Sequence, residues 1–381
     1  MNKYVKKMAL MIPFVNRYYK EIERYRSEIE GLCLEIERLR SNGIKYHSCE
    51  YIDNFNLRFS GRIDTGTRCM CFCCEPHLDF PRAALCETAE ESVMNFAKLR
   101  TEIIAESIRF SLLGKNAMDE DRRFTSECAK CPQFHLDYWK GDGLIHDIHM
   151  GMYNSPCQGK CIYCTVTQDF RMHSESNEKA FDVIEWAQNS DMTAQDLRWS
   201  FASGEITINP FRERIYGLVK DQIAIFLTNC FIFDEKIAAN LVANQQSSIN
   251  FSVDSGTPET WYKVKGVNNF DTVIGNLAKY LASGARPEQI LLKYIILPGI
   301  NDSLDDYRSI INIEKKLDIK SMVISTDMYA KQREPLIRPA GYFLAMLRKN
   351  NIATILDHHF FQDEIKKITD FADKLLISGE V

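Results

Sequence analysis

The sequence predicts an α/β protein: a partial (β/α)6-type barrel preceded by a small cysteine-rich metal-binding region and an N-terminal coiled-coil helix. Three observations support this fold class. Strand-like and helix-like segments alternate from Gly143 onwards, seven of the thirteen cysteines fall between Cys69 and Cys131, and an apolar seam runs through the first forty residues. Alternating strands and helices indicate parallel strands joined by right-handed crossovers. A seam with three- and four-residue spacing is typical of a coiled coil.

The length, composition and net charge of the chain limit the classes of protein to which it can belong. The 381 residues suffice for more than one compact unit, 45% of them are apolar, and the net charge is −5. Such a charge gives no reason to expect nucleic acid as a partner. The apolar run 8–15 is short and contains Pro13, and no apolar stretch approaches the roughly 20 residues that a bilayer span needs. We therefore expect a cytoplasmic protein with three regions, 1–43, 46–135 and 143–381.

The first region, 1–43, is predicted to be one amphipathic helix that ends at Ser41–Gly43. Its seam positions have Glu and Arg between them and are Val15, Tyr18, Ile22, Tyr25, Ile29, Leu32, Ile36 and Leu39. Such a stripe is buried against another helix. Two arrangements are open: packing within the same chain, or self-association into a homo-oligomer.

The second region, 46–135, is rich in cysteine. A hairpin is predicted over 57–74, followed by a helical stretch from Met94 to Ile104 and then by the C-x2-C pair. Such a pair, together with thiols from the hairpin, allows a four-thiolate site to close across the region. The candidate ligands are Cys69, Cys73, Cys74, Cys86, Cys128 and Cys131. Spacing permits either zinc or a [4Fe–4S] cluster, and it does not decide which thiols join the C-x2-C pair.

The third region, 143–381, alternates predicted strands with predicted helices. The strands cover 144–152, 197–203, 222–229, 249–254, 290–297 and 320–326, with 351–356 as a candidate seventh. Helices are predicted at 178–188, 235–245, 270–283 and 307–317. Ligands of such barrels gather where the strands end and the following loops begin. We therefore expect the functional site at this rim.

Three cysteines, Cys157, Cys161 and Cys164, directly follow the first of these strands. Their C-x3-C-x2-C spacing, with Tyr163 before the last thiol, favours an iron–sulfur cluster. Such clusters usually take four cysteines, so three leave one iron open to bind a substrate. Zinc is the alternative, although structural zinc loops favour paired C-x2-C units and four ligands. A disulfide is disfavoured because nothing in the sequence indicates an oxidising compartment.

Small or polar residues follow the later strands at the same rim. They are Ser203-Gly204-Glu205 after the second strand, Thr228-Asn229 after the third, Ser252 and Asp254 at the fourth, and Leu297–Asp302 after the fifth. Each is a weak signal alone, since a Gly-Glu after a strand is more often a turn. As a series beside a three-cysteine loop, they indicate one binding site. We expect His146 and His149 to be packing or hydrogen-bonding residues, and His358-His359 to lie at the surface or at a late strand end.

Over residues 143–326 the chain resembles radical SAM enzymes. The C-x3-C-x2-C loop with its aromatic residue is the most specific element, and Ser203-Gly204-Glu205 is similar to the family's Gly-Gly-Glu motif. The resemblance implies a [4Fe–4S] cluster on Cys157, Cys161 and Cys164, whose open iron binds S-adenosylmethionine (SAM) through its amino and carboxylate groups. One electron then cleaves the sulfonium, and a 5′-deoxyadenosyl radical abstracts a substrate hydrogen. The SAM-binding residues it implies are Tyr163, Ser203, Gly204, Glu205, Asn229, Ser252, Asp254, Lys265 and Gly299.

Residues 69–131 resemble the auxiliary-cluster region of the SPASM and twitch subgroup, although that region usually follows the barrel and here precedes it. This resemblance implies a second, auxiliary iron–sulfur cluster. Together the two resemblances imply an oxidoreductase, maturase or epimerase that oxidises or rearranges a peptide or sugar-type substrate. They also imply an electron donor such as flavodoxin or ferredoxin. The competing hypothesis is a non-catalytic iron–sulfur or zinc module that assembles through its N-terminal helix.

Overall fold

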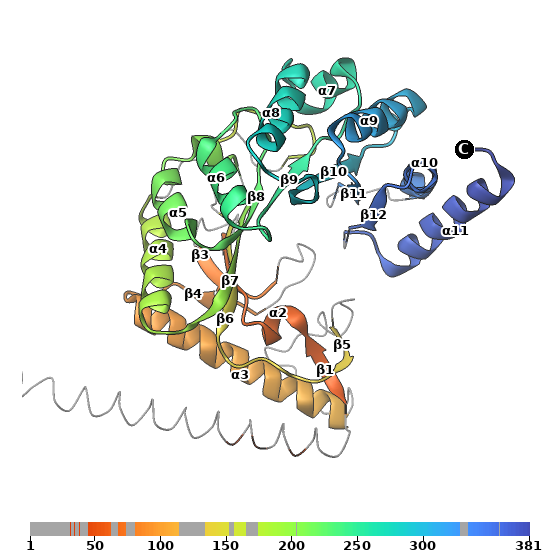
Figure 1. Ribbon diagram of the computed structural model, residues 1–381. Coiled ribbons are helices and arrows are strands. Elements are labelled where there is room, and N and C mark those ends of the chain that lie inside the picture. Colours follow the sequence, from red (N-terminus) through yellow and green to blue (C-terminus); the bar gives the residue numbers. More distant parts are fainter. Residues whose placement is uncertain are drawn as a thin grey trace, which may run out of the picture. The chain divides into compact units, whose positions relative to one another are not determined.

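The computed structural model describes residues 31, 34, 38, 45–61, 68–73, 81–113, 134–151, 156–164, 174–202, 204–327, 334–357 and 359–381. These residues form two compact units (Figure 1). The first draws on Met1–Asn56, Cys69–Ile145 and Lys179–Met192, and the second on Leu57–Arg68, His146–Glu178 and Thr193–Val381. Each unit is therefore built from three separate stretches of the chain. Nearly all of the predicted coiled-coil helix lies outside the described residues, so its partner stays a prediction.

The first unit contains a long helix, α3 (Ala89–Leu113), which includes the helical stretch predicted from Met94 to Ile104. It contacts β1 (Tyr46–Cys49), which pairs in antiparallel fashion with β5 (Phe134–Asp137). Two short strands, β3 (Arg68–Cys71) and β4 (Ala83–Ala84), form a second antiparallel pair.

Aromatic rings and one arginine hold this unit together. Phe72 stacks on Phe96 of α3 with ring centroids 4.2 Å apart, and Phe55 lies 5.5 Å from the Phe96 ring. Arg100 of α3 donates hydrogen bonds to the carbonyls of Ile52 and Asp53 at 2.7 and 2.9 Å, at the end of the short helix α2 (Glu50–Asp53). These contacts form an aromatic core for the unit.

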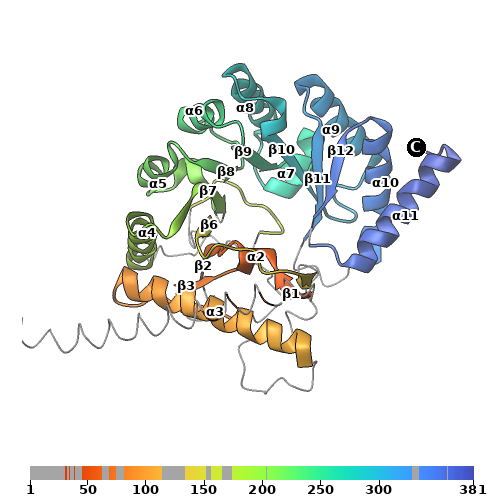
Figure 2. The same cartoon turned by 60° about the horizontal axis from the view of Figure 1, so that its bottom comes forward.

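The second unit is a parallel sheet with helices along its outer side (Figure 2). From β6 onwards the spatial order of the strands follows their order in the sequence, and β2 pairs in parallel with β6. The strands are β2 (Leu57–Gly61), β6 (Ile145–Gly151), β7 (Thr193–Ala202), β8 (Ile223–Leu227), β9 (Ser248–Ser252), β10 (Ile290–Ile296), β11 (Ser321–Thr326) and β12 (Ala353–Leu356). The pairs from β7 to β12 are all parallel, as expected for successive β/α units.

Helices follow these strands, and some of them begin or end at a capping residue. They are α4 (Ser174–Asn189), α5 (Arg212–Val219), α6 (Glu235–Ala243), α7 (Pro258–Lys265), α8 (Phe270–Ala282), α9 (Leu304–Leu317), α10 (Ile337–Lys349) and α11 (Gln362–Ser378), with short 3-10 turns η3 (Ile206–Ile208), η4 (Pro287–Gln289) and η5 (Glu334–Leu336). The Asp234 carboxylate accepts from the backbone of Lys236 and Ile237 at the start of α6, and Ser303 caps α9. Gly266 ends α7 in the left-handed region, at φ +69°.

The two faces of the sheet differ in chemistry. Large apolar side chains such as Trp199, Phe226 and Phe251 are fully buried on the face that the helices cover. The residues that alternate with them carry polar or charged side chains, among them Arg198, Ser200, Asn250, Ser252 and Lys293, and most of these are partly exposed. Since successive residues of a strand point to opposite faces, the inner face of this sheet carries these polar side chains together with the partly exposed Ile223, Ile225 and Leu227 of β8.

The α/β fold class is confirmed, with a strand at each of the six expected positions and β12 at the candidate seventh. Strands β2 and β3 occur where the arms of the hairpin were expected and are neighbours in the sheet order, and β2 also pairs in parallel with β6. Among the described residues, no helix combines the length and apolar character that a membrane crossing requires.

Candidate functional site

The cysteine loop follows β6 and forms backbone hydrogen bonds with the end of α7. Lys160 N–H donates to the Lys265 carbonyl at 2.8 Å, and Ile162 N–H donates to the Val264 carbonyl at 3.0 Å. A side chain at Gly266 would meet Lys160 Cβ at 2.8 Å, so the loop can lie this close only to a glycine. The loop therefore depends on a helix about a hundred residues further along the chain.

The three thiols differ in exposure. Cys157 and Cys161 are half-buried and Cys164 is exposed. A Cβ added to Gly159 would lie 3.7 Å from Cys157 Sγ and 3.5 Å from Cys161 Sγ, so both sulfurs border the space that this glycine leaves open. Burial is the main cause that raises the pKa of the Cys157 and Cys161 thiols.

Glu205 occupies a buried pocket beside Cys157. Its N–H donates to the Pro156 carbonyl at 2.9 Å, next to the first cysteine, and only 1% of the residue is exposed. One carboxylate oxygen accepts from the Thr207 hydroxyl at 2.8 Å and the Thr228 hydroxyl at 2.7 Å, and the other accepts from Asn229 N–H at 2.7 Å. Burial raises the pKa of Glu205, and these hydrogen bonds oppose the shift. Gly204 precedes it with φ +79°, a conformation that favours glycine.

Asn229 links this pocket to the first thiol. Its side-chain amide lies 3.6 Å from Cys157 Sγ and donates to Gln158 Oε1 at 3.1 Å. Its amide oxygen accepts from Phe231 N–H at 2.9 Å, which fixes the orientation of the side chain. Two of the strand ends that the sequence singled out therefore meet at Cys157.

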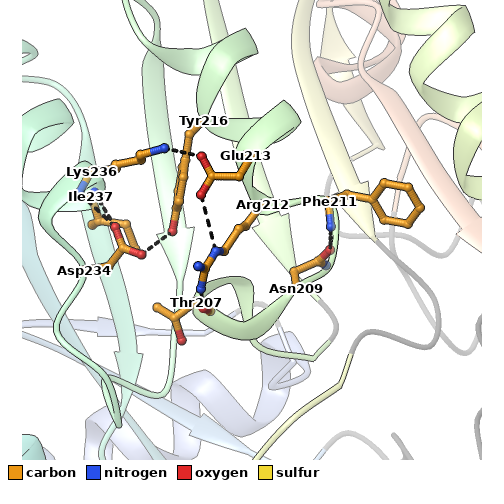
Figure 3. Close-up of polar contacts among 9 residues, drawn as sticks. All are labelled: Thr207, Asn209, Phe211, Arg212, Glu213, Tyr216, Asp234, Lys236 and Ile237. Carbon is orange, nitrogen blue, oxygen red and sulfur yellow. Dashed lines mark hydrogen bonds and ion pairs between the residues drawn. The ribbon is translucent and has the colours of Figure 1, made fainter.

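The two loops that carry Glu205 and Asn229 are braced by a network between α5 and α6 (Figure 3). Arg212 donates to the Thr207 carbonyl at 2.8 Å, and the Tyr216 hydroxyl donates to Asp234 at 2.9 Å. Lys236 and Glu213 form an ion pair that connects the two helices. Thr207 and this network were missed by the sequence analysis. Only the position of Thr207 two residues after Glu205, within reach of its carboxylate, could have indicated a role.

Tyr163, Asp254 and Lys265 form a second buried group, which we call the Tyr163 clamp. The Tyr163 hydroxyl donates to Asp254 Oδ2 at 2.5 Å and accepts from Lys265 Nζ at 2.8 Å, while Lys265 and Asp254 form an ion pair. Asp254 is 0% and Lys265 3% exposed. Burial is the main cause that raises the pKa of Tyr163 well above its usual value. The aromatic ring of the cysteine loop is therefore anchored at the end of β9.

The loop after β10 completes this side of the rim. Asn301 is fully buried, accepts from Leu297 N–H at 2.7 Å and donates to the Asp254 carbonyl at 2.9 Å. Gly299 lies in this turn with φ +77°. Ser252 lies on the inner face of β9, opposite Lys293 of β10. Ser203 lies outside the described residues.

The cysteines expected at an auxiliary site are only partly described. Cys69 is 7% exposed and pairs with Ala84 of β4, two residues before Cys86. Asn95 of α3 donates to Cys86 Sγ at 3.3 Å, and Cys73 follows β3. Cys74, Cys128 and Cys131 lie outside the described residues. Within the described part of the chain, no three His, Cys, Asp or Glu side chains are grouped so as to hold a metal ion, and this includes the cysteine loop.

Several solved structures are similar to this chain, all at low sequence identity. SuiB of Streptococcus suis bound to S-adenosylmethionine is 13% identical with a TM-score of 0.43, over 56% of this chain and 51% of SuiB. A radical SAM methyltransferase from Sphaerobacter thermophilus is 14% identical with a TM-score of 0.40, over 53% of this chain and 63% of that one. Native anSMEcpe with bound AdoMet is 16% identical with a TM-score of 0.43, over 55% and 63%. This chain thus spans about half of SuiB in that comparison.

No curated protein matches the chain. A family model does: residues 155–312, from the cysteine loop into α9, match the Radical SAM superfamily. The matched segment contains the three cysteines, the Glu205 pocket and the Tyr163 clamp, which the fold brings to one rim. This segment of the chain belongs to the radical SAM superfamily.

Proposed function

We propose that this protein reductively cleaves S-adenosylmethionine at a [4Fe–4S] cluster held by Cys157, Cys161 and Cys164. The observation that carries the proposal is the anchoring of the cysteine loop at both ends. Asn229 and Glu205 hold it beside Cys157, and Asp254 and Lys265 hold it at Tyr163. A loop that served only as a turn would not need two buried carboxylates to support it.

The donor set of the loop fits an iron–sulfur cluster. Three thiols are offered by eight consecutive residues, and two of their sulfurs border a space that Gly159 leaves free of side chain. The Asn229 amide donates toward Cys157 Sγ, as hydrogen bonds to cluster sulfurs do when they tune a potential. Sulfurs on a single zinc ion stand about 3.8 Å apart, given its Zn–S bonds of about 2.3 Å. The thiolates of a cluster bind different irons and therefore stand further apart.

When bound, the cluster would supply an open iron for the amino and carboxylate groups of SAM and the electron that cleaves its sulfonium. Glu205 is suited to bind the amino group, because its donors among the described residues are all neutral and none of them is a cation that balances its buried charge. A ligand ammonium would supply that cation. Ser203, Gly204 and Asn229 belong to the same pocket in this proposal.

The Tyr163 clamp has a different task in this proposal. Lys265 and Asp254 neutralise each other, so their first role is to hold the ring of Tyr163 and with it the end of the loop. That ring packs against Val264, Ile295 and Leu297. Direct contacts of Ser252, Asp254, Lys265 and Gly299 with SAM stay predictions.

We propose a polar organic substrate, a small molecule or a peptide, which is oxidised or rearranged after loss of a hydrogen atom. The polar side chains on the inner face of the sheet, such as Ser200, Asn250 and Ser252, support a polar substrate. An electron donor of the flavodoxin or ferredoxin type and a second cluster in the cysteine-rich unit belong to the same proposal. Cys69, Cys73 and Cys86 are the described candidates for that cluster.

Anaerobic reconstitution with iron and sulfide, followed by dithionite and SAM, tests the proposed function. Formation of 5′-deoxyadenosine is expected from the wild-type chain and not from the C157A/C161A/C164A variant. A wild-type protein that binds iron but forms no 5′-deoxyadenosine would contradict the proposal. It would favour the non-catalytic alternative.

Elemental analysis of the same samples tests the second cluster. About eight irons per chain are expected for two [4Fe–4S] clusters. About four irons with one zinc would make the site of the cysteine-rich unit structural and would remove it from any electron transfer.

A further inference from the structure

The side chain of Asn229 is directed at the first cysteine of the loop by its own hydrogen bonds. Its amide oxygen accepts from Phe231 N–H at 2.9 Å, so the amide nitrogen Nδ2 faces the other way. That nitrogen donates to Gln158 Oε1 at 3.1 Å and to Cys157 Sγ at 3.6 Å. An amide nitrogen carries two hydrogens, so it can serve both acceptors at once. One of its N–H groups therefore points to the Cys157 sulfur.

Gln158 determines how these two hydrogens are shared. Its amide oxygen faces Asn229, because the opposite orientation of the Gln158 amide would set two NH₂ groups against each other. One Asn229 hydrogen is thus taken by Gln158, and the other is left for Cys157 Sγ. The two amides and the thiol form one connected set of hydrogen bonds.

The turn that carries Asn229 is held in a rare conformation. Cys230, the next residue, has φ +54°, in the left-handed region that residues other than glycine seldom adopt. Its N–H donates to Thr228 Oγ1 at 3.1 Å, and its carbonyl accepts from Asn276 of α8 at 2.9 Å. A residue in such a conformation persists only where its surroundings hold it. The direction of the Asn229 side chain is therefore set by the fold around this turn.

A hydrogen bond to Cys157 Sγ has a defined effect if that sulfur is a cluster ligand. Reduction adds an electron and places more negative charge on the sulfurs of a cluster. An N–H donor therefore stabilises the reduced state more than the oxidised state, and the reduction potential rises. Groups that contact a metal ligand, rather than the metal, commonly tune a site in this way.

We propose that Asn229 raises the reduction potential of the cluster on the cysteine loop through its hydrogen bond to Cys157 Sγ. This inference rests on the part of the proposed function that assigns a cluster to this loop. Asn229 gives up neither a proton nor an electron. The electron comes from the external donor, and the amide only favours the state in which the electron has arrived.

A redox titration of the reconstituted full chain without SAM, followed by electron paramagnetic resonance, provides the first test. The signal that is missing from C157A/C161A/C164A identifies the loop cluster. Asn229→Ser keeps a side-chain oxygen for Phe231 N–H but has no amide hydrogen for Cys157 Sγ. The equilibrium constant for its reduction should fall by roughly twofold to tenfold. A tenfold fall is about 59 mV for a one-electron couple.

Asn276→Ala supplies the matched control. Asn276 holds the same turn, but it donates to the backbone carbonyls of Cys230 and Phe231 at 2.9 and 3.2 Å rather than to a thiol. Asn276→Ala should therefore lower the stability of the chain and leave the midpoint potential as in the wild type. An unchanged midpoint in Asn229→Ser, or an equal shift in Asn276→Ala, would overturn the inference.

A measurement on the wild type provides a second test that does not depend on how well the variants fold. The chain is labelled with asparagine that carries ¹⁵N only in its side-chain amide. Electron–nuclear double resonance on the reduced loop cluster without SAM should show a ¹⁵N coupling, which Asn229→Ser should lack. No coupling in the wild type would overturn the inference.

Neither readout measures SAM cleavage. A chain that shows the shift and the coupling but forms no 5′-deoxyadenosine would contradict the proposed function alone. A chain that forms 5′-deoxyadenosine without the shift or the coupling would contradict the role of Asn229 alone.

Discussion

Two buried carboxylates belong to residues that contact the cysteine loop near its two ends, and their hydrogen-bond partners differ in charge. Asp254, at the end of β9, pairs with Lys265 and also accepts from Tyr163 and from Ile295 N–H at 2.6 Å. Glu205, in the loop after β7, accepts only from neutral donors among the described residues, and burial raises its pKa. Their exposed fractions, 0% and 1%, are nearly equal.

This difference distinguishes a carboxylate that supports the loop from a carboxylate that can bind a ligand. A buried carboxylate and the cation that pairs with it are neutral together, and removing either partner leaves an unpaired charge. A buried carboxylate with only neutral donors keeps its net charge, so a cationic ligand can balance that charge. Glu314 of α9 is a third buried carboxylate, and neither of its oxygens has a hydrogen-bond partner within the described structure. Burial alone raises the pKa of Glu314 to about 8.

Breaking the ion pair of the Tyr163 clamp should have the largest effect on the stability of the protein. Asp254→Asn leaves Lys265 buried without its partner, and losing one member of a buried pair costs about 3–5 kcal/mol of unfolding free energy. Denaturant unfolding of the full chain measures this loss. Replacing both residues, as D254N/K265M, should recover part of it. A D254N protein as stable as the wild type would show that the ion pair contributes nothing.

Glu205→Gln tests the other side of the comparison. Hydrogen bonds to charged groups contribute about 1.5–3 kcal/mol, so SAM affinity should fall by roughly tenfold to a hundredfold. Stability should change little, because the variant also removes a buried charge. Equilibrium binding of SAM to the reconstituted protein gives the affinity. Unchanged binding, or a stability loss as large as that of D254N, would contradict the distinction between the two carboxylates.

Glu314→Gln should stabilise the protein in a pH-dependent way. The folded-state pKa of about 8 lies above the ordinary value of 4.5, so the folded chain holds the proton more tightly. Stability due to this group is therefore full below about pH 4.5 and is lost as pH rises toward 8. At pH 7 the variant should gain roughly 3 kcal/mol, at 1.36 kcal/mol per pKa unit. Thermal unfolding of both proteins at pH 5 and pH 8 should show the gain mainly at pH 8; equal gains would contradict the assignment.

Tyr163→Phe should have the smallest effect. It removes one hydroxyl from the clamp but leaves the ring and the Lys265–Asp254 pair, so the expected loss is about 0.5–1.5 kcal/mol. Unfolding in denaturant, compared with D254N in the same buffer, measures it. A loss equal to that of D254N would mean that the hydroxyl, rather than the ion pair, holds the loop.

The fold and the location of the site could be predicted from the sequence, because they depend on local pattern. Apolar strands alternating with amphipathic helices indicated the parallel sheet, and the spacing of Cys157, Cys161 and Cys164 indicated the rim that carries the site. Parallel strands then bring residues after successive strands together. Glu205 and Asn229 do meet at Cys157, as this rule requires.

The partners within the site could not be predicted in the same way. The ion pair of Lys265 with Asp254 depends on how α7 lies against the cysteine loop, and the expected contact of Lys265 with SAM stays a prediction. Likewise, His359 lies at a late strand end, but its contact with Asp357 and Ser325 depends on the register of β11 and β12. Short-range pattern does not determine such side-chain directions. The ligands of an auxiliary cluster stay predictions, since Cys74, Cys128 and Cys131 lie outside the described residues.

The central claim is that the cysteine loop holds a cluster with one iron open to SAM. Electron–nuclear double resonance on the reduced, reconstituted chain tests it directly, with SAM that carries ¹⁵N in its amino group. The account predicts a resolved ¹⁵N coupling to the cluster in the wild type, and none in the C157A/C161A/C164A variant. A wild-type spectrum that is identical with and without labelled SAM would contradict it.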